Sequence, residues 1–438
     1  MADSDIVMFC WPDLVGLNRG RSFPLSELPG RLKHGIILPP AVQALLPFPL
    51  IADPTPWGPM NDVILIPDED SEIKVDVAEG ASPLHLFMCD WYNLDGTLWT
   101  ACGRGFLKRA LDDLESETGL QVKSGVENEF HLSDVQPWPA PGFTVEALRL
   151  EEKFASRVMA ALQQAGTEPE TFEPEYGLAQ YEVATSPAIG IKAADRVAIT
   201  REVVREVARR MDRRASFTPI VNLGSVGNGV HTHISLIDAK GQPACFDAAK
   251  PGGVSELFGS FLAGVIRHLP ALCVFTAPSP ASYLRLTPGR WSSSAAAVGT
   301  GNREAALRLP PIWSGDGATP AKRLNAEYRA GDATASPHLT LGVLVRAGLE
   351  GIRERLPAPE LLNIPPSELD EAERKRRGIE LLPASLGEAL ALAEADAVVK
   401  GWFPDDLWSV FHSVKQGEIA CVRDMAPEEI AETYRKYY

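Results

Sequence analysis

The sequence predicts an α+β fold in two parts, a small and mainly antiparallel domain over residues 1–104 and a larger domain over residues 105–438. Three observations favour this division. The first hundred residues are rich in Pro and Gly and carry short β-like runs. From about residue 105 onward, longer amphipathic helices alternate with short strands. The length of 438 residues allows two to four domains and a large buried core.

Short apolar runs mark the expected strands of the first part. The segment Asn93-Leu94-Asp95-Gly96 separates two of them and predicts a hairpin, because Asp-Gly tolerates the positive φ of a tight turn. The expected strands are Ile6–Cys10, Val63–Ile66, Glu72–Val77, Leu84–Asp90 and Thr97–Ala101.

Helical periodicity dominates the second part. Leu150, Phe154, Val158 and Leu162 recur every four residues and predict one apolar helix face. The Pro-rich, charged segment 357–377 is expected to be an exposed excursion. The expected helices are Arg104–Glu117, Glu146–Ala165, Ala193–Met211 and His338–Leu356.

Composition excludes several partners. With 42 basic and 58 acidic residues the net charge is −16, which disfavours non-specific binding to nucleic acid or to an anionic membrane. No signal peptide or membrane-spanning run is visible. The six cysteines form no C-x-x-C pair, as is typical of a reducing compartment, so we expect a cytoplasmic protein.

Two acidic pairs are candidates for chemistry. Glu127 and Glu129 are two residues apart in a strand-like run, so both side chains are expected on one face. Glu175 and Glu182 lie on either side of a Gly-containing turn. Either pair alone is more often a solvated surface than a site.

A histidine pair follows a glycine-rich turn. After Gly227 and Gly229, the side chains of His231, His233 and Ser235 are expected on one strand face, where a site and a core position are equally good interpretations. Farther on, Glu327 and Arg329 share a strand face, which by itself would indicate only a surface salt bridge.

Several carboxylates with an imidazole and no thiolate favour Mg²⁺ or Mn²⁺ over a structural zinc. Arg285, Arg303 and Arg308 taken singly would be solvated charges, but arginines clustered beside such metals suit phosphoryl transfer from ATP. Neither a Walker-type phosphate loop nor a Rossmann glycine motif is present.

Taken in order, these stretches resemble the glutamine synthetase family over essentially the whole chain. The matching motifs include G-N-G-V-H-T-H-x-S, S-Y-x-R-L-x-P-G, N-R-x-A-A-x-R-x-P and E-Y-R-x-x-D-A-x-A-S-P-H-L. The resemblance implies an N-terminal β-grasp domain and a C-terminal catalytic α/β domain. It also implies active sites between neighbouring subunits of a homo-oligomer, usually a dodecamer of two stacked hexameric rings.

The resemblance further implies a role for each motif residue, with two or three Mg²⁺ or Mn²⁺ ions per site. Glu129, Glu175 and Glu182 would bind one metal, and Glu127, His231 and Glu327 another. Gly227, Arg285 and Arg329 would hold glutamate. Around the ATP phosphates and the transferred phosphoryl group would lie His233, Ser235, Lys322 and the catalytic Arg303 and Arg308.

Departures from the family pattern bear on the nitrogen substrate. Trp291 stands where glutamine synthetase proper has an acid that helps bind and deprotonate ammonium, although core packing would also explain a tryptophan. The family's ammonium-binding aspartate is missing near Asp53, and its adenylylated tyrosine is absent near residues 379–383. We therefore expect Trp291 to contact substrate.

The expected enzyme is an ATP-dependent ligase that joins the γ-carboxylate of glutamate to a small organic amine through a γ-glutamyl phosphate. The resemblance points to synthetases of γ-glutamylpolyamine, γ-glutamylethanolamine, γ-glutamylmethylamide or γ-glutamylanilide. Two alternatives stay open: a glutamine synthetase that uses ammonia, and an inactive family member with a structural or regulatory role.

Overall fold

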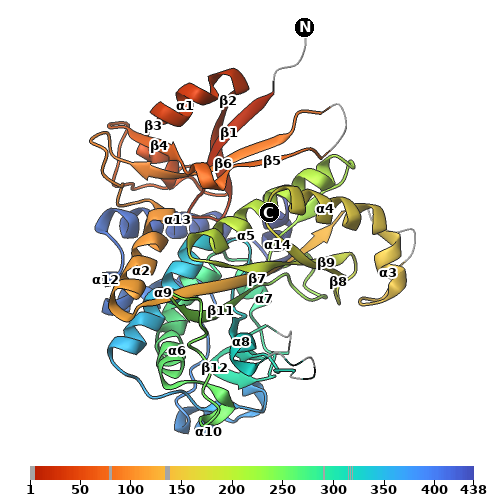
Figure 1. Cartoon of the computed structure of the whole chain (residues 1–438), viewed down its shortest axis with the longest axis vertical. Helices are drawn as coiled ribbons and strands as arrows, with labels where there is room; N and C mark the ends of the chain where they lie inside the picture. Colours follow the sequence, from red (N-terminus) through yellow and green to blue (C-terminus); the bar gives the residue numbers. More distant parts are fainter. Residues whose placement is uncertain are drawn as a thin grey trace.

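The computed structural model describes residues 5–77, 81–133, 139–289, 292–313, 315, 317 and 319–438. It confirms the α+β class, with the N-terminal strands gathered at one end of the molecule and the larger sheet and most helices beyond them (Figure 1). Trp291 lies outside the described residues, so its expected substrate contact stays a prediction.

The N-terminal sheet has six strands in the order β2-β1-β6-β4-β3, with β5 paired to β6. Its first and last strands, β1 and β6, pair in parallel, while the other pairs are antiparallel. The elements are β1 (Ile6–Pro12), β2 (Asn18–Pro24), α1 (Leu28–His34), β3 (Ile36–Leu38), β4 (Val63–Pro67), β5 (Ile73–Val75) and β6 (Leu84–Tyr92).

The hairpin prediction was right about the turn and wrong about its second arm. Asn93 N–H donates to Thr97 O at 2.8 Å, and Gly96 has a φ of 86°. Beyond the turn only one bridge forms, between Tyr92 and Leu98, because the chain then bends into helix α2 (Gly103–Thr118). Strands β2 and β3 were missed, since β2 is a polar edge strand and β3 has only three residues.

The second sheet has nine strands in the order β15-β12-β13-β14-β11-β7-β9-β8, with β10 paired to β7. The long strand β7 lies between β9 and β11 and is antiparallel to both. The strands are β7 (Leu120–Leu132), β8 (Pro169–Pro174), β9 (Gln180–Ile189), β10 (Ala215–Ser216), β11 (Val230–Asp238), β12 (Ala295–Thr300), β13 (Ala305–Leu309), β14 (Ala326–Tyr328) and β15 (Leu361–Leu362).

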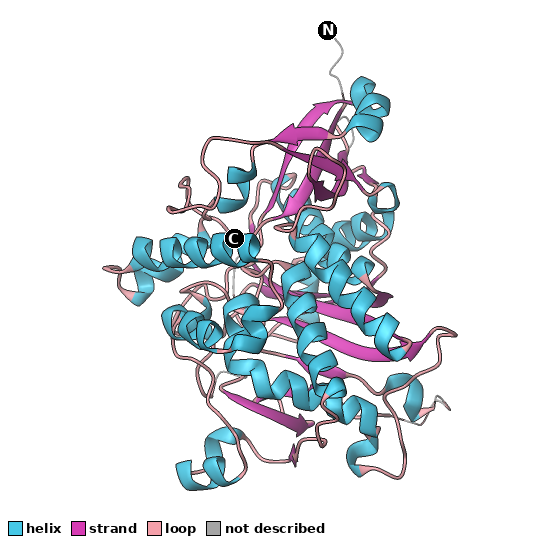
Figure 2. Ribbon diagram, turned by 90° about the vertical axis from the view of Figure 1, so that its left-hand side faces the viewer, coloured by secondary structure: helices cyan, strands magenta, loops and turns pink. Residues whose placement is uncertain are grey.

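Figure 2 shows helices stacked side by side in front of this sheet. Helix α6 is apolar and long enough to cross a membrane, but 78% of its most apolar window is buried in the fold, so it is a core helix. The helices after α2 are α3 (Val145–Leu150), α4 (Glu152–Gln164), α5 (Ile191–Arg209), α6 (Glu256–Thr276), α7 (Ser282–Arg285), α8 (Pro320–Arg323), α9 (Pro337–Arg353), α10 (Glu371–Arg376), α11 (Leu386–Ala395), α12 (Ala397–Gly401), α13 (Asp405–Val422) and α14 (Pro427–Arg435).

Two predictions for the second part need correction. The helix expected over 146–165 breaks at Glu151, whose backbone leaves the helical region (φ −111°, ψ 15°) while its buried carboxylate pairs with Arg213. The segment 357–377 is only partly exposed, because β15 extends the sheet, and Leu362 and Leu369 pack on Ala297.

Arg104 at the start of α2 joins the two parts of the chain. Its buried guanidinium donates to Asp68 and Asp90 of the N-terminal domain and to Asp195 of α5, at 2.6, 2.9 and 2.8 Å. His338 of α9 also reaches Asp195, at 2.7 Å. Burial by itself would lower the pKa of Arg104, but these carboxylates reverse the effect and raise it.

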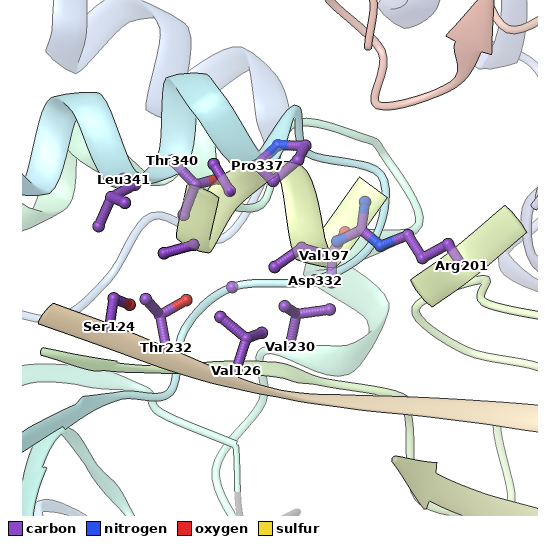
Figure 3. Close-up of a pocket in the computed structure, with 13 residues that line it drawn as sticks. Ser124, Val126, Val197, Arg201, Val230, Thr232, Asp332, Pro337, Thr340 and Leu341 are labelled. Atoms are coloured by element: carbon purple, nitrogen blue, oxygen red, sulfur yellow. The ribbon is translucent and has the colours of Figure 1, made fainter. Parts of the chain in front are cut away.

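A small gap lies at the face of the nine-stranded sheet that packs on α5 and α9. Figure 3 shows this gap, where Ser124, Val126 and Thr232 point from β7 and β11 toward Thr340 of α9. The gap measures about 20 Å³, enough for a single water molecule. Because side chains alternate along a strand, Glu127 and Glu129 project from the opposite face.

Candidate functional site

The strand register brings the predicted acids and histidines together. On β7, Glu127 lies opposite His231 of β11, and Glu129 lies opposite Glu182 of β9. On the far side of β11, His233 lies opposite Glu327 of β14. Four neighbouring strands thus supply one face of the sheet with carboxylates and imidazoles.

Glu129, Glu175 and Glu182 form the first cluster, with one oxygen of each within 4.8 Å of the others. Glu175 is held at the end of β8 by its backbone N–H, which donates to Gln180 O at 2.8 Å. Burial and the neighbouring carboxylates raise the pKa of Glu182 to about 10 and that of Glu175 to about 7. Three such acids can ionise together when a divalent cation with hard oxygen ligands lies between them, so this cluster fits Mg²⁺ or Mn²⁺.

The second cluster contains Glu127, His233 and Glu327, with one ligand atom of each within 4.8 Å of the others. His231 Nδ1 lies 3.1 Å from Glu127 Oε2 and 3.9 Å from Glu327 Oε1. His233, which we expected at the ATP phosphates, has its Nε2 3.0 Å from Glu127 Oε1 and stands in this cluster where we expected His231. His231 groups instead with Glu127 and Glu182. Burial opposes ionisation of Glu127, but hydrogen bonds with the two imidazoles outweigh it and lower the pKa of Glu127.

Arginines border the second cluster. Arg308 Nη1 donates to Glu327 Oε2 at 2.6 Å, and Arg329 donates to the other oxygen of the same carboxylate. Glu327 is completely buried, so its pairing with Arg329 is not a surface salt bridge. Arg285 is also buried, donates to the carbonyls of Gly331 and Arg329, and has its pKa lowered by burial.

Gly227 lies where its backbone passes close to Arg285. A Cβ at this position would clash with the carbonyl of Pro219 and would lie 2.7 Å from Arg285 Cγ, so only glycine fits. Two residues on, Gly229 N–H donates to Glu129 Oε2 at 2.7 Å. The glycine-rich turn therefore contacts both the arginines and the first cluster.

The predicted residues line two clefts that share Glu127. The first measures about 570 Å³, and the second about 520 Å³. Glu327 is buried beside the first cleft and lines neither. The first is lined by Glu127, Glu129, Glu175, Glu182, His231, Gly227, Arg285, Arg303, Arg308 and Arg329, and the second by Glu127, His233, Ser235 and Lys322.

Phe143, Glu173 and Tyr176 are among the residues that line the first cleft and were not predicted from the sequence. Glu173 of β8 pairs in register with Glu182, and burial together with the charge of Glu127 raises its pKa. Glu173 and Glu175 are two residues apart, like Glu127 and Glu129, and this spacing could have predicted that Glu173 faces the cleft. Phe143, 60% exposed, precedes α3 with no motif around it.

Comparison with known families gives two matches that together cover almost the whole chain. The family model described as "Glutamine synthetase, catalytic domain" matches residues 100–434, and the model described as "Glutamine synthetase N-terminal domain" matches residues 1–99. Among curated proteins, gamma-glutamylpolyamine synthetase GlnA3 of Streptomyces coelicolor is 31% identical over 99% of this chain and 93% of its own length. Glutamine synthetase of Pyrococcus woesei is 31% identical over 90% and 85%.

Two solved structures also resemble this chain over almost its whole length. A "novel glutamine synthase homolog" superposes with a TM-score of 0.93 at 40% identity, covering 100% of this chain and 99% of that one. A GmaS/ADP complex gives a TM-score of 0.82 at 25% identity, covering 98% and 96%.

Proposed function

The chain belongs to the glutamine synthetase family of ligases, and we propose that it couples ATP cleavage to amide formation between the γ-carboxylate of glutamate and an organic amine. The observation that carries this proposal is the meeting of two clefts at Glu127, between two carboxylate clusters that fit divalent cations. ATP entering one cleft and glutamate entering the other would meet at that point.

The chemistry explains why ATP is needed. A carboxylate resists attack by an amine because its charge is delocalised. A γ-carboxylate oxygen first displaces ADP from the γ-phosphorus of ATP, which gives γ-glutamyl phosphate. The amine nitrogen then attacks the acyl carbon, the bond to the phosphate oxygen breaks, and the nitrogen loses a proton.

The chain contributes positioning and charge rather than a nucleophile. Gly227, Arg285 and Arg329 would hold glutamate in the first cleft. In the second, His233, Ser235 and Lys322 would hold the ATP phosphates, with the guanidinium groups of Arg303 and Arg308 near the transferred phosphoryl group.

Two or three Mg²⁺ or Mn²⁺ ions, when bound, would neutralise phosphate charge. Glu129, Glu175 and Glu182 would hold one ion, and Glu127 and Glu327 another, together with His231. His233 is the alternative imidazole for the second ion, because it groups with both Glu127 and Glu327.

Phe143, Glu173 and Tyr176 support an organic amine over ammonia. Two exposed aromatic side chains beside a carboxylate suit a molecule that has both apolar surface and a cationic nitrogen. The similarity to a relative named gamma-glutamylpolyamine synthetase points the same way. Ammonia remains the competing substrate, favoured by similarity to relatives named glutamine synthetase.

We also propose a homo-oligomer of two hexameric rings. Exposed apolar side chains of the N-terminal domain, Ile37, Ile51 and Met60, support burial against another subunit. Light scattering under assay conditions tests this, and a monomer that retains full activity would contradict it.

A phosphate-release assay with glutamate, ATP and a panel of amines tests the reaction. The panel contains ammonia, alkylamines, ethanolamine, polyamines and arylamines. An organic amine should give the highest kcat/KM, with the γ-glutamylamide as product. Predominant glutamine formation would favour the ammonia alternative, and no turnover with any amine would favour the inactive one.

A further inference from the structure

Gln180, the first residue of β9, has its amide bonded to three separate parts of the site. The side chain is 2% exposed. Its Oε1 accepts from Gly177 N–H, in the turn between Glu175 and Glu182, at 2.9 Å. Its Nε2 donates to Gly227 O at 2.9 Å and lies 3.3 Å from Glu129 Oε2.

Asn228 continues this network into the core. Its Oδ1 accepts from Gln180 Nε2 at 3.0 Å and lies 2.9 Å from His131 Nδ1. Its Nδ2 donates to Thr218 O at 2.8 Å. Asn228 is 1% exposed, so the two amides form a buried, hydrogen-bonded unit.

The contacts fix which way each amide points. Gln180 Oε1 faces a backbone N–H, whereas its Nε2 faces only acceptors, so a flipped amide would lose these bonds. The amide is also neutral. A carboxylate at position 180 would add charge to the acidic cluster, and a lysine would pair with Glu129 and compete with a metal.

We propose that Gln180 and Asn228 form an amide brace that positions the metal-binding carboxylate of Glu129 relative to the glutamate-binding turn at Gly227. The inference rests on the proposed function for the roles of Glu129 and Gly227. Groups that hydrogen-bond a metal ligand from behind orient it, and their loss commonly weakens metal binding 10- to 100-fold.

The two members of the brace differ in what they touch. Gln180 contacts both Glu129 and Gly227, so its loss affects metal and glutamate together. Asn228 contacts Gln180 and adjoins Gly227 but makes no bond to Glu129, so its loss acts mainly on glutamate. A purely structural role would not separate the two ligands in this way.

The test uses Gln180→Met, which keeps the length of the side chain and removes the amide. Mn²⁺ affinity is measured by electron paramagnetic resonance without substrates, and glutamate affinity by calorimetry and by KM. Gln180→Met should weaken Mn²⁺ about 10-fold or more and raise the KM for glutamate more than it lowers kcat. Asn228→Leu should raise that KM while leaving the Mn²⁺ Kd within about threefold of wild type.

Gln43 supplies a matched control. It is a buried glutamine of the N-terminal domain, and its amide accepts from Trp11 Nε1 at 2.9 Å and donates to Ala101 O at 3.1 Å. Gln43→Met should lower thermal stability like Gln180→Met but leave Mn²⁺ and glutamate binding unchanged.

Wild-type Mn²⁺ and glutamate affinities in a folded Gln180→Met would overturn the proposal. If Gln180→Met does not fold, Asn228→Leu tests the proposal instead. An unchanged KM for glutamate in that variant would overturn the proposal. Ligand binding needs no turnover, so altered binding without any amide product would contradict the proposed function while supporting the brace.

Discussion

Arg308 and Glu327 lie opposite each other on the antiparallel strands β13 and β14, with Arg308 Nη1 2.6 Å from Glu327 Oε2. Arg329 takes the second carboxylate oxygen, so one fully buried acid holds two guanidinium groups beside a cluster that fits a metal. We therefore expect Glu327 to contribute both to the stability of the fold and to the chemistry.

We expect Glu327→Ala to abolish activity and to destabilise the fold by roughly 3–5 kcal/mol, because the buried Arg329 and the partly buried Arg308 lose their partner. Glu129→Ala should abolish activity too, at a smaller cost in stability, since its loss relieves the repulsion that its charge exerts on Glu175 and Glu182. Urea unfolding and phosphate release measure the two effects. Full turnover by either variant would contradict the metal assignment.

Metal removal should abolish activity and expose a pH dependence of stability. Glu182, with its pKa raised to about 10, keeps its proton in the folded metal-free protein at neutral pH, whereas the unfolded chain ionises near pH 4.3. The stability that this protonated carboxyl gives the folded state is fully present below about pH 4.3 and is lost as the pH rises toward about 10. The raised pKa of His233 gives the same sign.

Between pH 7 and 8, the metal-free protein should therefore lose up to about 1.4 kcal/mol of unfolding free energy per proton released. Saturating Mg²⁺ should flatten this slope, because metal replaces the proton. Urea melts in excess chelator and in Mg²⁺ measure both slopes. If the unfolding free energy falls equally with pH in chelator and in Mg²⁺, then Glu182 does not bind the metal.

Arg104→Met should destabilise the protein by roughly 3–5 kcal/mol, since it leaves Asp68, Asp90 and Asp195 without their shared cation. Arg353→Met is the control. Arg353 pairs with Glu117 at the surface and should cost less than about 1 kcal/mol. Equal costs in urea unfolding would show that the buried network does not join the domains.

Glu173→Gln should raise the KM for a diamine or polyamine several-fold, because a neutral amide attracts an ammonium group less strongly. The KM for glutamate should stay near wild type, since Glu173 belongs to neither carboxylate cluster. Steady-state kinetics with putrescine and with ammonia measure the effect. A uniform loss with both nitrogen donors would assign Glu173 to metal binding instead.

Most of the site was readable from the sequence because it follows strand periodicity. Glu127 and Glu129, or His231 and His233, share a face wherever a strand forms, and the family motifs then indicate which strands are neighbours. The structure adds that His231 and His233 both reach Glu127, a point that depends on side-chain distances rather than on spacing.

The residues that were missed depend on tertiary contacts. Phe143 reaches the first cleft from a loop, and nothing local marks it. The break between α3 and α4 follows from the pairing of Glu151 with Arg213, sixty-two residues along the chain. Helical periodicity depends on neighbouring residues only, so it cannot predict a partner that is distant in the sequence.

Trp291→Glu should shift the enzyme toward ammonia, because it places an acid where glutamine synthetases proper bind ammonium. We expect the indole to make an apolar or cation–π contact with the amine that is worth about 0.5–2 kcal/mol, and the variant would lose it. The ratio of kcat/KM for the organic amine to that for ammonia measures the shift. An unchanged ratio would leave Trp291 with a packing role only.

A competition assay measures directly whether the enzyme prefers an organic amine to ammonia. Wild-type enzyme receives glutamate, ATP, Mg²⁺ and equal concentrations of ammonia and the best organic amine from the panel, and mass spectrometry quantifies both products. The γ-glutamylamide should predominate over glutamine. Predominant formation of glutamine would contradict it.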